Sequence, residues 1–371
     1  MIAALLLPVL LAQAAPADAD CVVITGVRIL TVSHGEIEAG TLILHGDKIG
    51  AVGADVQPPP GAKVLDRKGL TVFPGILNPL SRLGMPDAAG AAGSAQHLAA
   101  DEFNPVSEAI GPAARSGVTL FALQPSGGGF AGQGAFVKPV GWTRPQQMLE
   151  KAAFLRLVLQ PGSTPKDALK QGLEGARKAF DADRKKIDDK TAALVQFLKG
   201  DLVCIAEAGT PAELLHFWQL LDSIPDCTPK VVIAATGDVY KAAADLGARK
   251  ARVILRPALS LAPFTRERIN TAAELDKAGV QIAFAPLTET RESLEGMFFR
   301  VGELVKYGLS REAGLRALTL SPAEMLGVDR RVGSLEAGKD ADFLLLTGDP
   351  LSPLTRIQEV YINGRPVVPG E

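Results

Sequence analysis

The sequence contains few side chains that could bind a transition metal. Its 371 residues include four histidines and three cysteines, and no Cys-x-x-Cys pair occurs. A zinc site needs several imidazoles, thiolates or carboxylates that converge on one ion. A cysteine zinc site is therefore excluded. Because the cysteine count is odd, a disulfide framework is not expected either, although a bridge between Cys204 and Cys227 stays open beside two separate thiols.

The chain also lacks an excess of charge of either sign. It has 39 lysines and arginines against 41 aspartates and glutamates, and 47% of its residues are hydrophobic. A balanced charge without long runs gives no electrostatic surface for nucleic acid or an anionic membrane. We therefore expect an ordinary globular protein that does not bind nucleic acid, with length enough for two or three domains.

A long apolar run is missing from the N-terminus as well. Residues 2–11 are apolar, but about ten residues are too few for a membrane span, which needs roughly 20. Small-residue triplets follow, of the kind that precede signal-peptidase cleavage, although no Lys or Arg precedes the run. We expect residues 1–15 to be a signal peptide of an exported protein, periplasmic or secreted, without a membrane span.

Short apolar runs alternate with helical patterns after Pro74, which indicates a parallel sheet covered by helices. Proline follows an N-cap residue at Thr164, Thr210 and Ser321, as is typical of helix starts. About 250 residues from position 72 match a (β/α)8 TIM-like barrel, with an eighth strand missing or disguised. The expected strands are 72–77, 118–123, 202–206, 231–235, 252–255 and 281–285, with 135–137 as a weaker seventh.

Several segments resemble the amidohydrolase superfamily. Residues 71–84, TVFPGILNPLSRLG, are similar to its first barrel strand, Pro-Gly-Leu-Ile-Asp-Ala-His-Thr-His-Leu-Gly, and residues 333–346 to its Gly-Ser-Leu-x-x-Gly-Lys-Asp-Ala-Asp stretch. Residues 23–30, 40–53 and 360–365 resemble its small β-domain, and residues 101–105, 116–119 and 132–134 its imidazolonepropionase-like branch. The resemblance implies a barrel of residues 72–329 and a composite β-sandwich domain of residues 20–71 and 330–371.

The resemblance also implies a reaction, the hydrolysis of C–N bonds in amides or cyclic amides with zinc or another divalent metal. The residues for that metal are missing. Leu80 and Arg82 stand where the His-x-His pair would be, and neither side chain can ligate zinc. No histidine falls in 204–208 or 233–237, and no aspartate in 286–288. Lys138, the nearest candidate for a bridging carbamate, is expected to snorkel from a strand end.

The four histidines do not replace this set. His34 and His45 precede the expected barrel, and His216 is expected on an outer helix, so that only His97 could approach the barrel mouth. A lone loop histidine is more often a solvated side chain than a ligand. We therefore expect no metal and no cofactor.

Polar residues at strand ends are candidates for lining a pocket, because loops converge at the barrel mouth. An internal salt-bridge network explains them equally well. Arg82 would be costly to bury unpaired, and we expect it to neutralise Glu207 or Glu289. The candidates are Asn78, Ser81, Arg82, Asp101, Glu102, Glu207, Asp238, Arg256, Glu289 and Arg291.

Two further motifs carry no chemistry. The glycine-rich residues 127–134 lack the Gly-Lys-Ser/Thr of a phosphate loop and are expected to form a turn, and no serine has a Gly-x-Ser-x-Gly context. Three hypotheses remain. They are a pseudoenzyme that binds a small molecule or forms a homo-oligomer or a hetero-oligomer with an active relative, a hydrolase with a rearranged carboxylate site, and a purely structural protein.

Overall fold

The computed structural model describes residues 21–86, 93–180, 187–236, 238–261 and 264–367. The expected signal peptide, residues 1–15, lies outside this part of the chain. Within it, no helix combines the length and apolar character that crossing a membrane requires.

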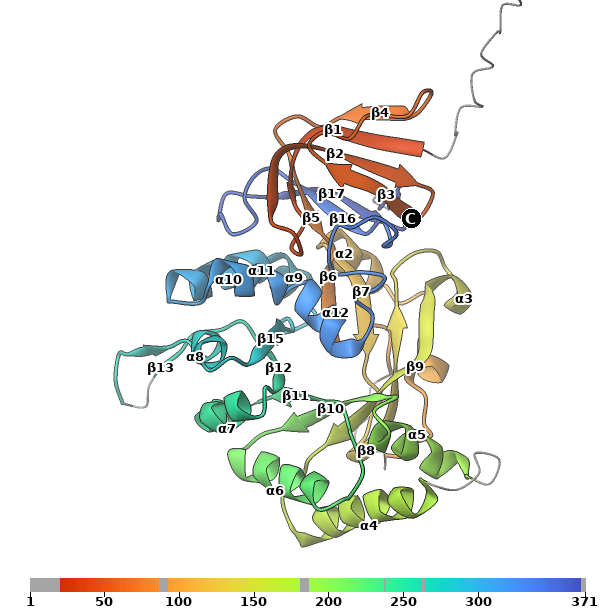
Figure 1. Cartoon of the computed structure of the whole chain (residues 1–371), viewed down its shortest axis with the longest axis vertical. Coiled ribbons are helices and arrows are strands. Elements are labelled where there is room, and N and C mark those ends of the chain that lie inside the picture. The colour runs from red at the N-terminus through yellow and green to blue at the C-terminus, as the bar shows by residue number, and fades with distance from the viewer. Residues whose placement is uncertain (1–20, 87–92, 181–186, 237, 262–263, 368–371) are drawn as a thin grey trace, which may run out of the picture.

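The two ends of the chain build one eight-stranded sheet, drawn in red and dark blue at the top of Figure 1. β5 pairs antiparallel with β16, with Phe73 opposite Leu344, so the C-terminal strands extend the sheet that the N-terminal strands begin. The strands are β1 (Cys21–Leu30), β2 (Glu36–His45), β3 (Lys48–Gly53), β4 (Lys63–Asp66), β5 (Thr71–Pro74), β16 (Phe343–Leu346), β17 (Ile357–Ile362) and β18 (Arg365–Pro366).

A second eight-stranded sheet forms the barrel, in the order β15-β12-β11-β10-β9-β8-β7-β6. β15 and β6 are bridged by the turn before α12, where Phe284 N–H donates to Ala317 O (2.8 Å) and Leu77 N–H to Leu318 O (3.1 Å). The expected barrel class is confirmed, in a nearly closed form. The strands are β6 (Ile76–Ser81), β7 (Val118–Leu123), β8 (Gly129–Val137), β9 (Met148–Val158), β10 (Val203–Ala208), β11 (Val231–Ala235), β12 (Arg252–Leu255) and β15 (Gln281–Phe284).

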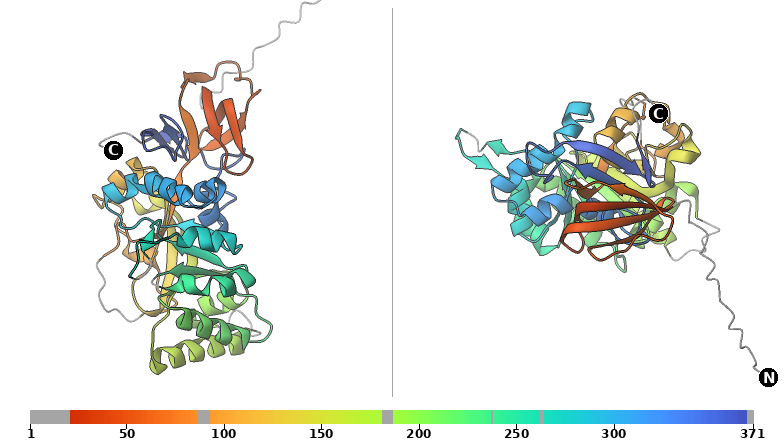
Figure 2. Two further views of the ribbon diagram at one scale, coloured as in Figure 1. Left: turned by 90° about the vertical axis from the view of Figure 1, so that its left-hand side faces the viewer. Right: turned by 90° about the horizontal axis from the view of Figure 1, so that it is seen from above.

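Helices cover the outside of the barrel, and α4, α5 and α6 lie at the end farthest from the first sheet in both side views (Figures 1 and 2). A short hairpin, β13 (Ser260–Leu261) with β14 (Arg268–Ile269), precedes α8. The helices are α1 (Ala99–Glu102), α2 (Ile110–Arg115), α3 (Arg144–Gln147), α4 (Ser163–Ala179), α5 (Asp189–Leu198), α6 (Pro211–Asp222), the 3-10 helix η2 (Val239–Ala242), α7 (Ala243–Ala248), α8 (Thr271–Lys277), α9 (Arg291–Glu295), α10 (Met297–Lys306), α11 (Arg311–Arg316) and α12 (Leu320–Leu326).

The expected strand 72–77 is wrong as a single element. It consists of β5 and β6, which belong to different sheets and meet at Gly75. Gly75 N–H donates to Asp342 O (3.0 Å) on one side, and Ile76 N–H donates to Gly117 O (2.9 Å) on the other. Apolar periodicity alone does not show a chain that changes sheets, because both halves are buried.

The glycine-rich segment is also corrected, since residues 129–137 form a strand and not a turn. β8 runs antiparallel to both β7 and β9, whereas the other neighbouring strands of this sheet are parallel. Glycine is needed at Gly134, where a Cβ atom would lie 2.0 Å from the Phe154 ring. Strand β9 escaped prediction because polar and apolar residues do not alternate in its exposed first half.

The predicted start of α6 agrees with the structure, whereas α4 and α12 begin earlier than predicted. The Thr210 hydroxyl accepts from Glu213 N–H (3.2 Å), and Pro211 stands in the first turn. α4 begins one residue before Thr164, after Gly162, and α12 begins at Leu320, before Ser321. Cys204 and Cys227 do not form a disulfide, and burial raises the pKa of the Cys204 thiol.

Lys138 follows β8 and is buried, with 3% of its side chain exposed. It does not snorkel to solvent as expected. Its Nζ lies 2.6 Å from Asp340 Oδ2 and 2.7 Å from Asp342 Oδ2, and it donates to Asn363 Oδ1 (2.6 Å). Lys48 and Arg331 also pair with Asp340. The Lys-Asp-Ala-Asp segment thus binds the barrel to the first sheet through buried charges.

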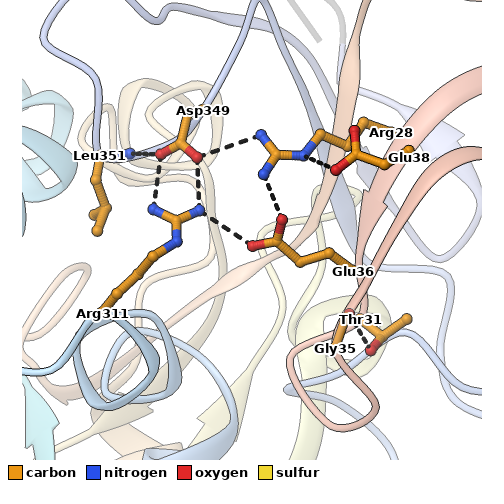
Figure 3. A network of polar contacts seen from close by, with 8 residues as sticks. All are labelled: Arg28, Thr31, Gly35, Glu36, Glu38, Arg311, Asp349 and Leu351. Atoms are coloured by element: carbon orange, nitrogen blue, oxygen red, sulfur yellow. Dashed lines mark hydrogen bonds and ion pairs between the residues drawn. The ribbon is translucent and has the colours of Figure 1, made fainter.

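A second ionic network joins the first sheet to α11 (Figure 3). Arg311 binds both oxygens of Asp349, at 2.9 and 2.6 Å, and its Nη2 lies 3.3 Å from Glu36 Oε1. Arg28 of β1 pairs with Glu36, and its Nη1 lies 3.3 Å from Asp349 Oδ2. These contacts connect segments that are more than 270 residues apart in the chain.

We expect Asp349→Asn to lower the free energy of unfolding by about 1 kcal/mol at pH 7, since the network is partly exposed. Burial would raise the pKa of Asp349, but hydrogen bonds from Arg311 and Leu351 N–H lower it. The contribution of a carboxyl with a lowered folded pKa is fully present above the ordinary aspartate pKa and is lost as the pH falls through the folded pKa. Urea unfolding at a series of pH values should therefore show a deficit that is largest at pH 7 and shrinks as the pH falls into the acid range. Glu38→Gln, whose side chain is 84% exposed, is the control and should change nothing.

Candidate functional site

Glu289 is the centre of a polar cluster at the barrel mouth, in the loop between β15 and α9. Its Oε1 accepts hydrogen bonds from Asn78 Nδ2 (2.7 Å) and Ser81 Oγ (2.6 Å), and its Oε2 accepts from the backbone N–H of Arg82 (2.7 Å). The donors lie on or directly after β6, where the resemblance places metal-binding histidines. The carboxylate is therefore bound by protein donors that the sequence had marked only as separate candidates.

The donors are themselves held in place. The Asn78 Oδ1 atom accepts from Leu80 N–H (3.1 Å) and the Ser81 hydroxyl accepts from Leu83 N–H (3.2 Å), and both side chains are buried. Burial raises the pKa of Glu289, while hydrogen bonds from Ser81, Arg82 N–H and Asn78 and the charge of Arg82 act in the opposite direction. The cluster thus holds a carboxyl with a raised pKa against the buried donor side chains of Asn78 and Ser81.

Arg82 does not form the ion pair that we expected from the sequence. Its guanidinium donates to two backbone carbonyls, Pro86 O at 2.8 Å and Gln124 O at 3.4 Å, and no carboxylate within the described residues lies in ion-pair distance of it. Glu207 pairs instead with Arg156 of β9, at 2.7 Å. The guanidinium is thus hydrogen-bonded to carbonyls instead of a carboxylate, and its charge acts to lower the pKa of Glu289 without an ion pair.

The other candidates make separate local contacts. Glu102 Oε1 lies 3.4 Å from His97 Nε2, and Asp101 is exposed on α1. Arg256 donates to Leu287 O (2.6 Å). Asp238 pairs with Lys241, and Arg291 with Glu295, both at 2.6 Å on the surface. Of the ten candidates, the structure thus gathers Asn78, Ser81 and Arg82 around the carboxylate of the fourth, Glu289.

The mouth does not fit a catalytic zinc ion. Across the parts of the chain that the structure describes, no three His, Cys, Asp or Glu side chains form a group that could hold a metal. The chemistry of the cluster agrees, because Asn78, Ser81 and Arg82 N–H present donors to Glu289 where a metal would need lone pairs. Leu80 packs against the apolar core beside them.

A cavity of about 1090 Å³ lies next to this cluster. It opens at the carboxyl end of β9 and is walled by α4, α5 and α6, and the Arg82 side chain forms part of its lining. Arg156 and Ser126 also line it, as does His216, which is exposed on α6. Sequence reasoning missed the lysines of this cavity, because pocket candidates were sought at the ends of strands and these lysines lie on helices α4 and α5.

Comparison with known proteins agrees with the sequence resemblance. The Amidohydrolase family matches residues 269–367. Imidazolonepropionase from Syntrophobacter fumaroxidans is 35% identical over 124 residues, 31% of this chain and 28% of that protein. N-acetylglucosamine-6-phosphate deacetylase from Danio rerio is 42% identical over 60 residues, 16% of this chain and 14% of that protein. The chain is therefore similar to the amidohydrolase superfamily in its C-terminal segment and in these shorter matches.

Solved structures of this superfamily share the fold over almost the whole chain. An amidohydrolase from Thermotoga maritima MSB8 superimposes with a TM-score of 0.80 at 22% identity, covering 94% of this chain and 99% of that one. Atrazine chlorohydrolase TrzN from Arthrobacter aurescens TC1, solved in complex with zinc, gives a TM-score of 0.56 at 19% identity, covering 93% and 94%. Because the curated relatives match over less than a third of their length, their activities describe those proteins alone.

Proposed function

We propose that this amidohydrolase-like protein is a pseudoenzyme, which does not hydrolyse C–N bonds through a bound metal and instead binds a small molecule. The observation that carries the proposal is the hydrogen-bonded Glu289, whose oxygens accept from Asn78, Ser81 and Arg82 N–H. A metal-bound hydroxide is the nucleophile of the superfamily's hydrolysis, and the residues at this mouth supply donors instead of ligands.

The cavity beside the mouth favours a binding role over a purely structural one. Its volume of about 1090 Å³ is at the upper end of ordinary ligand pockets. Leu80 occupies one position of the lost histidine pair, yet it does not fill the cavity, whose lining begins at Arg82. We also propose that the protein is exported, and that it forms a homo-oligomer or associates with an active relative.

We expect the purified protein to contain far less than one equivalent of zinc, iron or manganese, and to show no chelator-sensitive hydrolysis of amides or cyclic amides. Elemental analysis after purification without chelator measures the first, and assays with and without added metal measure the second. Near-stoichiometric metal that chelators remove together with activity would contradict the proposal.

A metal-free hydrolase is the second candidate, and the raised pKa of Glu289 favours it, because a carboxyl with a raised pKa keeps its proton to higher pH and is better suited to act as a general acid. The same assays distinguish the metal-free hydrolase from the pseudoenzyme. Chelator-resistant hydrolysis that Glu289→Gln abolishes would support this candidate, whereas its absence in the unmodified protein supports the pseudoenzyme.

A further inference from the structure

The cavity beside the barrel mouth has an uneven charge distribution. Five cationic side chains line it, Arg82, Arg156, Lys166, Lys170 and Lys190, against the carboxylates of Asp167 and Glu213. The Glu213 carboxylate already has protein partners at the start of α6. Its Oε2 accepts hydrogen bonds from Gly209 N–H (2.9 Å) and Thr210 N–H (3.1 Å). The cavity therefore has positive charge that its own carboxylates do not balance.

Some of these cationic side chains form ion pairs with carboxylates, and others do not. Arg156 pairs with Glu207 at 2.7 Å, and Lys170 pairs weakly with Glu174 at 3.8 Å. The side chains of Lys166 of α4 and Lys190 of α5 make no hydrogen bond or ion pair within the described part of the chain. The charge of Lys190 does act on the neighbouring Asp188, whose pKa it helps to lower. These two lysines stand on different helices that wall the same cavity and can both reach a bound anion.

A further feature of the lining points to a polar ligand. The lining residue Ser126 is only 7% exposed, and its hydroxyl has no hydrogen-bond partner within the described residues. Such an unpaired hydroxyl is unusual for a buried polar group.

The lining of the cavity also contains apolar side chains. Leu194 and Phe217 are buried beneath the cavity, and Phe130, Leu159 and Leu220 line it with partly exposed side chains. An apolar ligand body would be removed from water here, while its charged head could meet the lysines.

We propose that this cavity binds an organic anion, a carboxylate or phosphate head on an apolar body, with the head between Lys166, Lys190 and Ser126. This inference deepens the binding role proposed above by naming the ligand class. Binding is measured without turnover, so failed binding contradicts the anion site alone, whereas bound metal with hydrolysis contradicts the pseudoenzyme alone.

Isothermal titration of the full protein with phenylacetate, phenyl phosphate and neutral 2-phenylacetamide tests the site. We expect at least one anion to bind and the amide to bind at least tenfold more weakly, since charge-assisted hydrogen bonds are about twice as strong as neutral ones. Binding of only one anion would identify the head group and support the proposal. Equal binding of the amide, or no binding of either anion at millimolar concentration, would overturn it.

Variants then locate the anion. The exposed pair Lys166→Gln and Lys190→Gln, combined, should weaken anion binding about tenfold or more, and Ser126→Ala should weaken it less. Lys178→Gln removes the same charge from the far end of α4, where the lysine is exposed, and should leave the affinity unchanged. Unchanged affinity in the double variant, or equal losses in Lys178→Gln, would contradict the assigned position.

Discussion

Replacing Lys138 with methionine is expected to lower the free energy of unfolding by roughly 3–5 kcal/mol at neutral pH, the largest loss among the substitutions considered. The methionine leaves Asp342, whose side chain is only 3% exposed, without a paired cation among the described residues. Asp340 keeps Lys48 and Arg331. An unpaired buried carboxylate costs far more than the ion pair itself contributes, because its desolvation is no longer compensated. Urea unfolding monitored by circular dichroism measures the loss.

The pH dependence distinguishes this mechanism from a simple packing defect. Burial raises the pKa of Asp342, and Lys138 opposes that rise. Without Lys138 the folded pKa rises further, so the variant should recover stability as the pH falls and Asp342 becomes protonated. Asp342→Asn in the Lys138→Met background should likewise recover part of the loss at neutral pH.

Lys48→Met is the matched control, because Lys48 pairs with the same Asp340 but its side chain is 39% exposed. Its loss should stay near 1 kcal/mol or below. Equal losses for the two variants, or a Lys138→Met deficit that does not change with pH, would show that the buried pair is not the cause.

Gly75→Ala is expected to cost about 1–3 kcal/mol, the usual range for overpacking a rigid core. A Cβ atom at this position would lie 2.1 Å from Thr119 Oγ1 and 2.4 Å from Thr119 Cγ2. The backbone cannot move away easily, because Gly75 and Ile76 are hydrogen-bonded to Asp342 and Gly117 in opposite directions. Thermal unfolding of the variant measures the cost.

A compensating substitution tests the cause. Thr119→Ala removes the two nearest atoms and should restore part of the stability of Gly75→Ala, beyond the sum of the single effects. Gly175→Ala on α4 is the control, since no atom lies within 4 Å of the added Cβ and alanine favours a helix by roughly 0.5–1 kcal/mol. A loss at Gly75 that Thr119→Ala does not relieve would contradict the steric explanation.

The two substitutions concern the same junction between the sheets. Gly75 lets the chain leave β5 and enter β6, and Lys138 holds the Asp340–Asp342 segment that lies against that crossing. The Glu289 cluster is built on the far end of β6. The position of Asn78 and Ser81 therefore depends on how the two sheets are joined, which links the stability of the junction to the geometry of the candidate site.

Much of the fold was predictable because its signals are local. Alternating apolar runs and helix starts indicated the barrel, and Thr210 caps α6 as expected. The antiparallel β8 was not predictable, because glycine is a poor strand former. Only the nearby Phe154 ring and Leu123 carbonyl explain why a side chain is excluded at Gly134.

The sequence by itself determined that the first barrel strand cannot supply metal ligands at positions 80 and 82. Leucine and arginine offer no lone pair to a metal, whatever the direction of their side chains. Only the tertiary structure decided what stands there instead. Glu289 is more than 200 residues from Asn78, Ser81 and Arg82, and Arg82 contacts it through its backbone, which no side-chain pattern reveals. Contacts between distant segments depend on how strands are placed around the barrel, and that placement is a property of the whole fold.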